Sequence, residues 1–479
     1  MKGRLSRAPL VLALGAAGAG MLLAGAFALG SDVDAELADR LALFVAAFPV
    51  LIGSAFLAAR RPEWSVTATL GLIAFSGALA ANWGIQVRPV VWVLLLGLLL
   101  ATFAGYINSR RASAIVIWPG IVAVAAYVLF SALQIPFAET TEIGARAFAA
   151  GPALIVAFFA LGYARWTPET RWRIAQGFIL VALLAGLYAL FRLFAGPTGA
   201  EESVARRSAG VAGDLALFGS FPGRLELGAW SAVAIPMLFT LALAARGRWR
   251  WAAAAAAALM IVALIGSEVR TALIGAGLGI AVAAVLFQLA RAFRGEAGSA
   301  LLALVALAVA GVMGFGLTVG GDAESTERFE RIASPGEDYS FQQRVAKWDA
   351  ALADINDEPL GEGLGTTGIT QRQYSRVFRL DNRYIDNSYL QLGVAQGYPG
   401  WILFGLAVIL TGYMLARSSL VTADRRLAAI GLGAVASLLT YLVVLLTGDM
   451  LTSWGALLVW MLLGLGAGGF VSDYPGRRA

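Results

Sequence analysis

Residues 270–290, RTALIGAGLGIAVAAVLFQLA, place one arginine in front of 20 residues without a charged side chain. An α-helix needs about 20 apolar residues to cross the hydrocarbon core of a bilayer. Similar blocks fill most of the 479-residue chain, which is 59% hydrophobic and only 14% charged, against about a quarter charged in soluble domains. The sequence therefore predicts an all-α polytopic membrane protein.

About 14 transmembrane helices (12–14) are expected from these blocks. They fall at about 8–30, 41–59, 65–83, 89–107, 114–133, 146–164, 177–195, 227–245, 251–267, 271–290, 299–319, 397–416, 427–447 and 453–470. Ala26-Phe27-Ala28 resembles a signal-peptide cleavage site. The first block is longer than the 7–15 apolar residues of a signal core, however, so we expect it to be retained as a helix.

The arginines predict which side of the membrane each loop faces. With a cytoplasmic N-terminus, the cytoplasmic loops and tails hold 20 of the 36 basic residues, and every such loop has at least two. This agrees with the enrichment of Lys and Arg in cytoplasmic loops. Both termini are then cytoplasmic, and the long polar interval 320–396 faces outward, which in a bacterium means the periplasm or the cell exterior.

The chain is thus expected to have three parts: residues 1–319 with helices 1–11, a large helical periplasmic loop at 320–396 that carries catalytic elements, and residues 397–479 with helices 12–14 and a cytoplasmic tail. The chain has no cysteine and no histidine. This excludes disulfides, thiolate catalysis and the commonest general base, so acid–base chemistry falls to groups such as Asp, Glu, Lys or Tyr. Asp32-Val33-Asp34 has a D-x-D pattern, which we interpret as a solvated loop rather than a metal site. The net charge of +6 is a topology signal, and no nucleic-acid partner is expected.

An amphipathic helix is predicted at 341–355 in the polar interval. Ser340-Phe341-Gln342-Gln343 has capping-box spacing, and apolar residues follow at helical spacing. Arg344 and Trp348 lie four residues apart on one face, so a guanidinium would stand beside an aromatic ring that can stack on a sugar. A plain surface helix is the alternative.

A glycine-rich turn follows at 361–368, GEGLGTTG. A dinucleotide site would require a preceding strand in a βαβ unit, and none is present. We expect the glycines to allow a tight turn or the close approach of a ligand, where backbone N–H groups could cradle an anion.

Two polar elements complete the interval. The first is a basic run suited to anionic lipid heads, a diphosphate or an acidic glycan, with a nonspecific lipid anchor as the alternative. It consists of Arg372, Arg376, Arg379 and Arg383. The second is Asp386-Asn387 at the start of the next helix, where Ser388 and Gln391 again have capping-box spacing. Asp386 either caps this helix with Asn387 or is a carboxylate that takes a proton from a sugar hydroxyl.

Two further arginines lie at the predicted membrane boundary. Arg270 stands between two apolar blocks with almost no loop and could pair with Glu268 or bind an anion at the floor of an outward cavity. Arg224 begins another helix and could bind an anion or anchor the helix at the interface.

The ordered set of motifs resembles the O-antigen ligase and O-antigen polymerase superfamily. The motifs are Arg270 near Ser267 and Thr271, the Arg344-x-x-x-Trp348 helix, the Gly-x-Gly-x-Gly turn at 361–365, Asp386-Asn387-x-Tyr389-Leu390, and Gly397-x-x-Gly400. The resemblance covers about 265–416. It implies a metal-independent, cofactor-free glycosyltransferase of the GT-C type that transfers a glycan from undecaprenyl diphosphate at the periplasmic face.

The resemblance also implies roles for particular residues. Arg270 and Arg344, with Arg224, match family arginines that bind the diphosphate, and Asp386 takes the place where ligases carry histidine. This replacement is compatible with the polymerase branch, so we favour a polysaccharide polymerase over a ligase that joins the glycan to lipid A-core or another acceptor. A flippase of lipid-linked sugars is a third reading. The hypothesis is inverting transfer, with catalysis by Asp386, Arg270 and Arg344 and substrate binding by Arg224, Trp348, Arg379, Arg383, Asn387 and Tyr389.

Overall fold

The computed structural model of the protein describes residues 51–107, 118–209, 216–296, 339–368, 385–446 and 448–472. Within these ranges all regular elements are helices and no strand occurs, which confirms the predicted all-α class. The longer helices are α3 (Pro62–Ala74), α4 (Ser76–Trp83), α5 (Val87–Ile107), α6 (Pro119–Leu133), α7 (Thr141–Ala150), α8 (Val156–Gly162), α9 (Pro168–Ala195), α10 (Gly199–Ala209), α11 (Arg224–Ala244), α12 (Arg248–Gly266), α13 (Arg270–Phe293), α16 (Tyr339–Asp357), α18 (Ser388–Val421), α19 (Arg425–Val444) and α20 (Trp454–Ser472). Two 3₁₀ turns, η1 (Ile135–Phe137) and η2 (Pro152–Ile155), flank α7.

In the part of the chain that the structure describes, nine helices are long and apolar enough to cross a membrane. The count is up to ten if α3 and α4, which are bent by 67° at Phe75, form one span. The spans expected at 8–30 and 299–319 lie outside the described residues, and of the span at 41–59 only Leu51–Arg60 is described as helix. A multi-pass membrane protein is thus supported, while the total of 14 helices stays a prediction.

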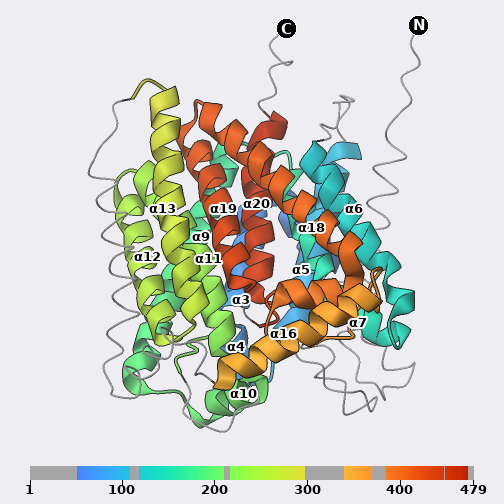
Figure 1. Cartoon of the computed structure of the whole chain (residues 1–479). Helices are drawn as coiled ribbons and strands as arrows, with labels where there is room; N and C mark the ends of the chain where they lie inside the picture. The colour runs from blue at the N-terminus through green and yellow to red at the C-terminus, as the bar shows by residue number, and fades with distance from the viewer. Residues whose placement is uncertain are drawn as a thin grey trace, which may run out of the picture.

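The long helices stand side by side, with α11 and α19 at the centre of the bundle (Figure 1). In the apolar stretches of these two helices 89% and 83% of the residues are buried. Side-chain hydroxyls tie the central helices together, because Ser437 of α19 donates to the Val233 carbonyl of α11 and Thr440 donates to the Gly275 carbonyl of α13. Such small polar residues let membrane helices approach closely.

Helix α16 lies across the lower end of the bundle in Figure 1. Its observed bounds, Tyr339–Asp357, contain the helix expected at 341–355. Ala351 and Ile355 are buried against Ile385, Leu390 and Val394. The apolar face of this amphipathic helix therefore packs against the start of α18.

Helix α18 is broken at Gly397, whose φ of 63° is not helical. Two carbonyls of the preceding turn lose their helical partners there. Pro399 has no N–H to give to the Ala395 carbonyl, and the N–H of Tyr398 bonds to the Pro359 carbonyl instead of that of Val394.

The glycine-rich turn supplies the missing donors. The N–H of Glu362 bonds to the Val394 carbonyl at 2.9 Å, and the N–H of Gly363 bonds to the Ala395 carbonyl at 3.0 Å. An unpaired backbone group inside a membrane costs several kcal/mol, so these two bonds stabilise the break. The turn therefore approaches α18 closely, and the approach to a ligand stays a prediction.

Only glycine fits this turn at the position of closest contact. Gly363 has φ of 99°, which side-chain-bearing residues rarely adopt. A Cβ at this position would also collide with the backbone of Phe137 and Ala138.

We predict that Gly363→Ala strongly destabilises the fold. The backbone conformation alone costs about 1–3 kcal/mol for a residue with a Cβ, and the collision adds to this. The measurement is the midpoint of thermal unfolding of the purified protein in detergent. Gly277→Ala is the matched control, because Gly277 lies inside α13 with no atom within 4 Å of an added Cβ, and alanine there should be neutral or up to about 1 kcal/mol more stable. Equal midpoints for the two variants would contradict this account of the turn.

Candidate functional site

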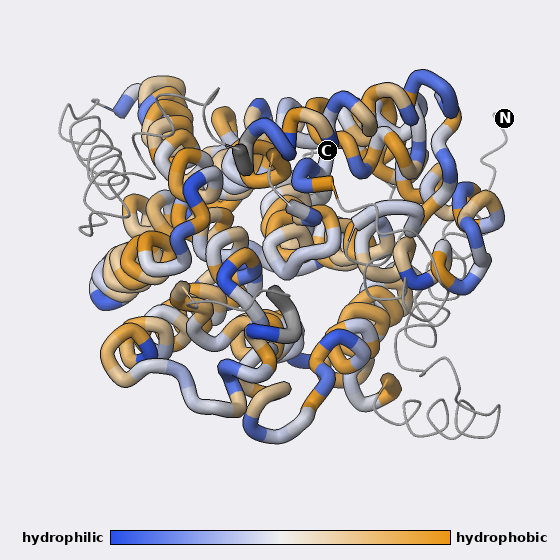
Figure 2. Tube along the Cα trace, turned by 60° about the horizontal axis from the view of Figure 1, so that its bottom comes forward, coloured by the Kyte–Doolittle hydropathy of each residue, from blue (hydrophilic) through white to orange (hydrophobic). Residues whose placement is uncertain are grey.

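Those residues singled out by the sequence that the structure describes gather at the end of the bundle that α16 crosses. The first residues of α11, α13 and α18 lie at this end, as does the turn between α19 and α20 (Figure 1). Figure 2 turns this end toward the viewer and shows hydrophilic stretches between the apolar ends of the helices. The site is therefore assembled from elements that are far apart in the sequence.

Arg344 and Asp386 meet across two of these elements. The Nε of Arg344 on α16 lies 3.6 Å from the Oδ2 of Asp386, which directly precedes the cap of α18. The side chains are 47% and 29% exposed. An ion pair this exposed is weak, so both groups can exchange partners with a substrate.

Asn387, and not Asp386, caps α18. Its Oδ1 accepts hydrogen bonds from the N–H groups of Tyr389 and Leu390, at 2.9 and 3.3 Å. Only 9% of Asn387 is exposed. The cap therefore leaves the Asp386 carboxylate to face Arg344, while the substrate-binding role expected for Asn387 stays a prediction.

The capping box expected between Ser388 and Gln391 is wrong, because Asn387 occupies the cap one residue earlier. Ser388 instead donates to the Gly448 carbonyl at 2.7 Å and accepts from the Met450 N–H at 2.9 Å. The side-chain amide of Gln391 donates to the Ile385 carbonyl at 2.5 Å. Both side chains thus fix the start of α18 to its surroundings.

Trp348 and Tyr389 are both half-buried. Trp348 packs against the cluster that joins α16 to α18. The hydroxyl of Tyr389 donates to the Leu442 carbonyl at 2.7 Å. Their packing is structural, and sugar stacking by either ring stays a prediction.

Arg224 and Arg270 begin two neighbouring helices. Arg224 pairs with Glu268 at 3.7 Å, and both side chains are at least half exposed. Glu268, considered in the sequence as a partner for Arg270, has φ of 57° and is the one non-glycine residue with positive φ in the described ranges. Arg270 is the half-buried first residue of α13. Helix N-termini carry a partial positive charge, so both arginines stand where an anion is favoured.

Two parts of the expected site cannot be placed. Arg379 and Arg383, with the rest of the basic run 372–383, lie outside the described residues, and so does Asp32-Val33-Asp34. Among the residues that are described, no group of three or more His, Cys, Asp or Glu side chains could hold a metal ion.

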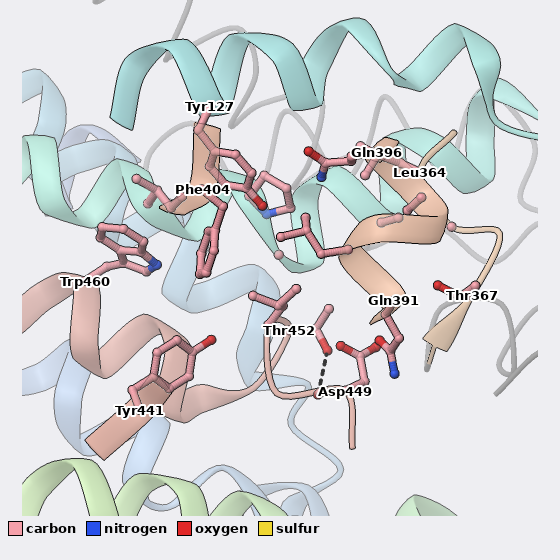
Figure 3. Close-up of a pocket in the computed structure, with 18 residues that line it drawn as sticks. Tyr127, Leu364, Thr367, Gln391, Gln396, Phe404, Tyr441, Asp449, Thr452 and Trp460 are labelled. Carbon is pink, nitrogen blue, oxygen red and sulfur yellow. Dashed lines mark hydrogen bonds between the residues drawn. The ribbon is translucent and has the colours of Figure 1, made fainter. Parts of the chain in front are cut away.

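Sequence reasoning missed one carboxylate at this end. Asp449 lies in the turn between α19 and α20, only 5% exposed, and lines a cavity of about 70 Å³ together with Thr367, Gln391 and Gln396 (Figure 3). The sequence did contain a signal for it, because Asp449 is the single acidic residue in the short loop between two apolar blocks.

The turn that carries Asp449 is anchored from several helices. Besides the two bonds to Ser388, the hydroxyl of Tyr441 donates to the Met450 carbonyl at 3.0 Å, and the guanidinium of Arg88 donates to the Thr452 carbonyl at 2.8 Å. The carboxylate of Glu226 accepts from the N–H of Trp454 at 2.8 Å. Asp449 is therefore held in place beside the first turn of α18.

Comparison with known proteins gives one match to a family and none to an individual curated protein. Residues 255–405, from the middle of α12 into the second half of α18, match the family model described as O-antigen ligase, which supports the resemblance of this part of the chain to the O-antigen ligase and polymerase superfamily.

Proposed function

We propose that this protein is a glycosyltransferase that moves a glycan from undecaprenyl diphosphate to a sugar hydroxyl at the periplasmic face of a bacterial inner membrane. Members of the matched family are glycosyltransferase-like enzymes, and they imply lipid-linked glycan substrates and acceptors. The observation that carries the proposal is the pairing of Arg344 with Asp386 at 3.6 Å, because it joins a carboxylate and a guanidinium at the membrane boundary.

The reaction requires two kinds of assistance. The acceptor hydroxyl is a poor nucleophile until a base takes its proton. The bond from the anomeric carbon to the diphosphate oxygen breaks with inversion, and negative charge develops on the leaving diphosphate. Asp386 would take the proton, and arginines that bind the developing charge more tightly than the ground state would lower the barrier.

The arrangement of the arginines supports this division of roles. Arg344 faces Asp386 from α16, while Arg224 and Arg270 stand at the N-termini of α11 and α13. Each of the three lies at least partly open to solvent. In this proposal Arg224, Arg270 and Arg344 hold the diphosphate, and Arg379 and Arg383 add positive charge.

The distribution of basic residues supports an outward-facing site. The helices that begin at the site end, such as α11, α13 and α18, finish next to arginine-rich loops at the opposite end. Among the described residues these loops and the helix ends beside them hold Arg60, Arg61, Arg165, Arg171, Arg173, Arg246, Arg248, Arg250, Arg291, Arg294, Arg417, Arg425 and Arg426. Arginines of this kind mark cytoplasmic ends, so both termini would be cytoplasmic.

Polymerase and ligase are the two candidate activities. Asp386 in place of the ligase histidine favours a polymerase that lengthens lipid-linked polysaccharide. The description of the matched family as O-antigen ligase favours the alternative of transfer to lipid A-core or another acceptor. Polymerases and ligases share one fold, so only the reaction product distinguishes the two activities.

The product test uses purified protein and a lipid-linked oligosaccharide repeat unit, analysed on gels. We expect a ladder of lengthened lipid-linked chains. Transfer onto an added lipid A-core acceptor without a ladder would identify a ligase. Movement of the lipid-linked sugar across proteoliposomes without glycosidic bond formation would contradict both and indicate a flippase.

We predict that Asp386→Asn lowers the turnover number about 10²–10⁴-fold, the usual contribution of a general base, with little change in donor binding. Turnover and donor affinity are measured separately on the same preparation. Asp349→Asn is the matched control, because Asp349 is exposed on α16. A wild-type turnover number for the Asp386→Asn variant would show that Asp386 is not the base.

We predict that Arg344→Ala lowers kcat/KM for the donor about 10²–10³-fold, as removal of one group that stabilises a developing oxyanion does. Arg344→Lys should recover only part of this, because an ammonium keeps the charge but loses the planar fork that matches a phosphate. Lys347→Ala, an exposed position on the same helix, is the control and should behave as wild type. An Arg344→Ala variant with unchanged kinetics would rule out the proposed contact.

A further inference from the structure

The cavity beside the start of α18 has a group of polar side chains among the apolar residues of its lining. It is lined by the side chains of Tyr127 from α6, Gln391 and Gln396 from α18, Thr367 from the glycine-rich turn, Tyr441 from α19 and Asp449 (Figure 3). Each of these residues is at most 8% exposed. Polar side chains on membrane helices are costly, face cavities and mark substrate pathways, so this lining points to a hydrophilic occupant.

Two oxygen atoms of the lining converge on one region. A Cβ built on Gly368 would lie 2.6 Å from the Oδ2 of Asp449 and 2.9 Å from the Oε1 of Gln391. The amide of Gln391 is oriented by its bond from Nε2 to the Ile385 carbonyl, which leaves Oε1 on the side of Asp449. A carboxylate and an amide oxygen next to each other form a pair of hydrogen-bond acceptors for hydroxyl groups.

Aromatic rings complete the lining. Phe404 and Trp460 lie on the wall of the cavity beside Tyr127, and all three are at most 5% exposed. Apolar ring faces suit the C–H faces of a sugar, while the polar groups suit its hydroxyls. A cavity needs about 10–15 Å³ to hold one water. The cavity of about 70 Å³ therefore has room for about five waters, which is the size of one sugar ring rather than of an oligosaccharide.

The position of the cavity favours the acceptor sugar, rather than the donor, as its occupant. Gln391 connects the cavity to Ile385, the residue before Asp386, and the hydroxyl that Asp386 would deprotonate belongs to the acceptor. The arginines proposed to hold the donor diphosphate lie on α11, α13 and α16, and none of them lines the cavity. A sugar in the cavity would therefore lie close to the chain segment that carries the proposed base, and it would contact none of the arginines proposed to hold the diphosphate.

We propose that this cavity binds one sugar of the acceptor glycan, with Asp449 and Gln391 accepting hydrogen bonds from its hydroxyls. The inference rests on the proposed function and adds Asp449, which lies beyond the matched residues 255–405, as a residue that determines acceptor specificity. No bond is made or broken by Asp449 in this role.

The test uses the full-length protein with two separately varied substrates. The donor is the lipid-linked repeat unit, and the acceptor probe is the same oligosaccharide released from its lipid diphosphate, so that it can accept but not donate. We expect Asp449→Asn to raise KM for the acceptor about tenfold to a hundredfold, because a hydrogen bond to a charged group is lost. KM for the donor should change less than about twofold.

Asp424→Asn is the matched control. Asp424 caps α19 at the other end of the bundle, and asparagine caps helices as well as aspartate does, so its kinetics should equal those of wild type. If Asp449→Asn unfolds at a lower temperature than the control, Thr367→Val is used instead. It removes a second polar group of the lining and should raise the acceptor KM about twofold to tenfold, the usual contribution of a neutral hydrogen bond.

The outcomes separate this inference from the proposed function. Unchanged acceptor KM in folded variants, or a rise in the donor KM instead, overturns the acceptor site. If wild type transfers nothing, the proposed function fails, and direct calorimetric binding of the released oligosaccharide then decides the inference alone. Binding by wild type that Asp449→Asn weakens tenfold supports the cavity as a glycan site, and equal binding, or none to either protein, overturns it.

Discussion

The site depends on two backbone hydrogen bonds at the break of α18. The N–H groups of Glu362 and Gly363 pair with the Val394 and Ala395 carbonyls that the break leaves without helical partners. In water such groups could bond to solvent, but in a membrane protein the chain itself must supply the donors. The glycine-rich turn is therefore fixed against α18, and α16, which precedes the turn directly, is fixed with it. Arg344 reaches Asp386 because of this attachment.

The first turn of α18 organises polar groups on two of its sides. Asn387 takes the capping role and leaves Asp386 to face Arg344. Ser388 binds the turn between α19 and α20 through Gly448 and Met450, which places Asp449 at the cavity. A single helix start thus follows the proposed base directly and borders the proposed acceptor site, and Gln391 connects the two through the Ile385 carbonyl.

Much of this could be predicted from the sequence, because the membrane imposes simple constraints. Helix length and apolar composition predicted the long apolar helices that the structure describes, such as α5, α9, α11, α13 and α19, and α16 followed from its periodicity and turn signals. The capping box at Ser388 was wrong because several polar residues compete for one cap, and their spacing does not say which of them wins. The partner of Glu268 and the role of the glycine turn depend on contacts between distant segments. Asp449 was missed for the same reason, since its significance comes from the buried cavity that α6, α18 and α19 form around it.

The central claim is that Arg344 and Asp386 act as one unit in transfer. A double-mutant cycle on kcat/KM, with Arg344→Ala, Asp386→Asn and the combined variant acting on the lipid-linked repeat unit, tests it most directly. Residues that share one step have strongly non-additive effects. The account predicts that the double variant is scarcely slower than the more damaged single variant. If the fold-losses in kcat/KM of the two single variants multiply in the double variant, as they do for independent sites, the claim is contradicted.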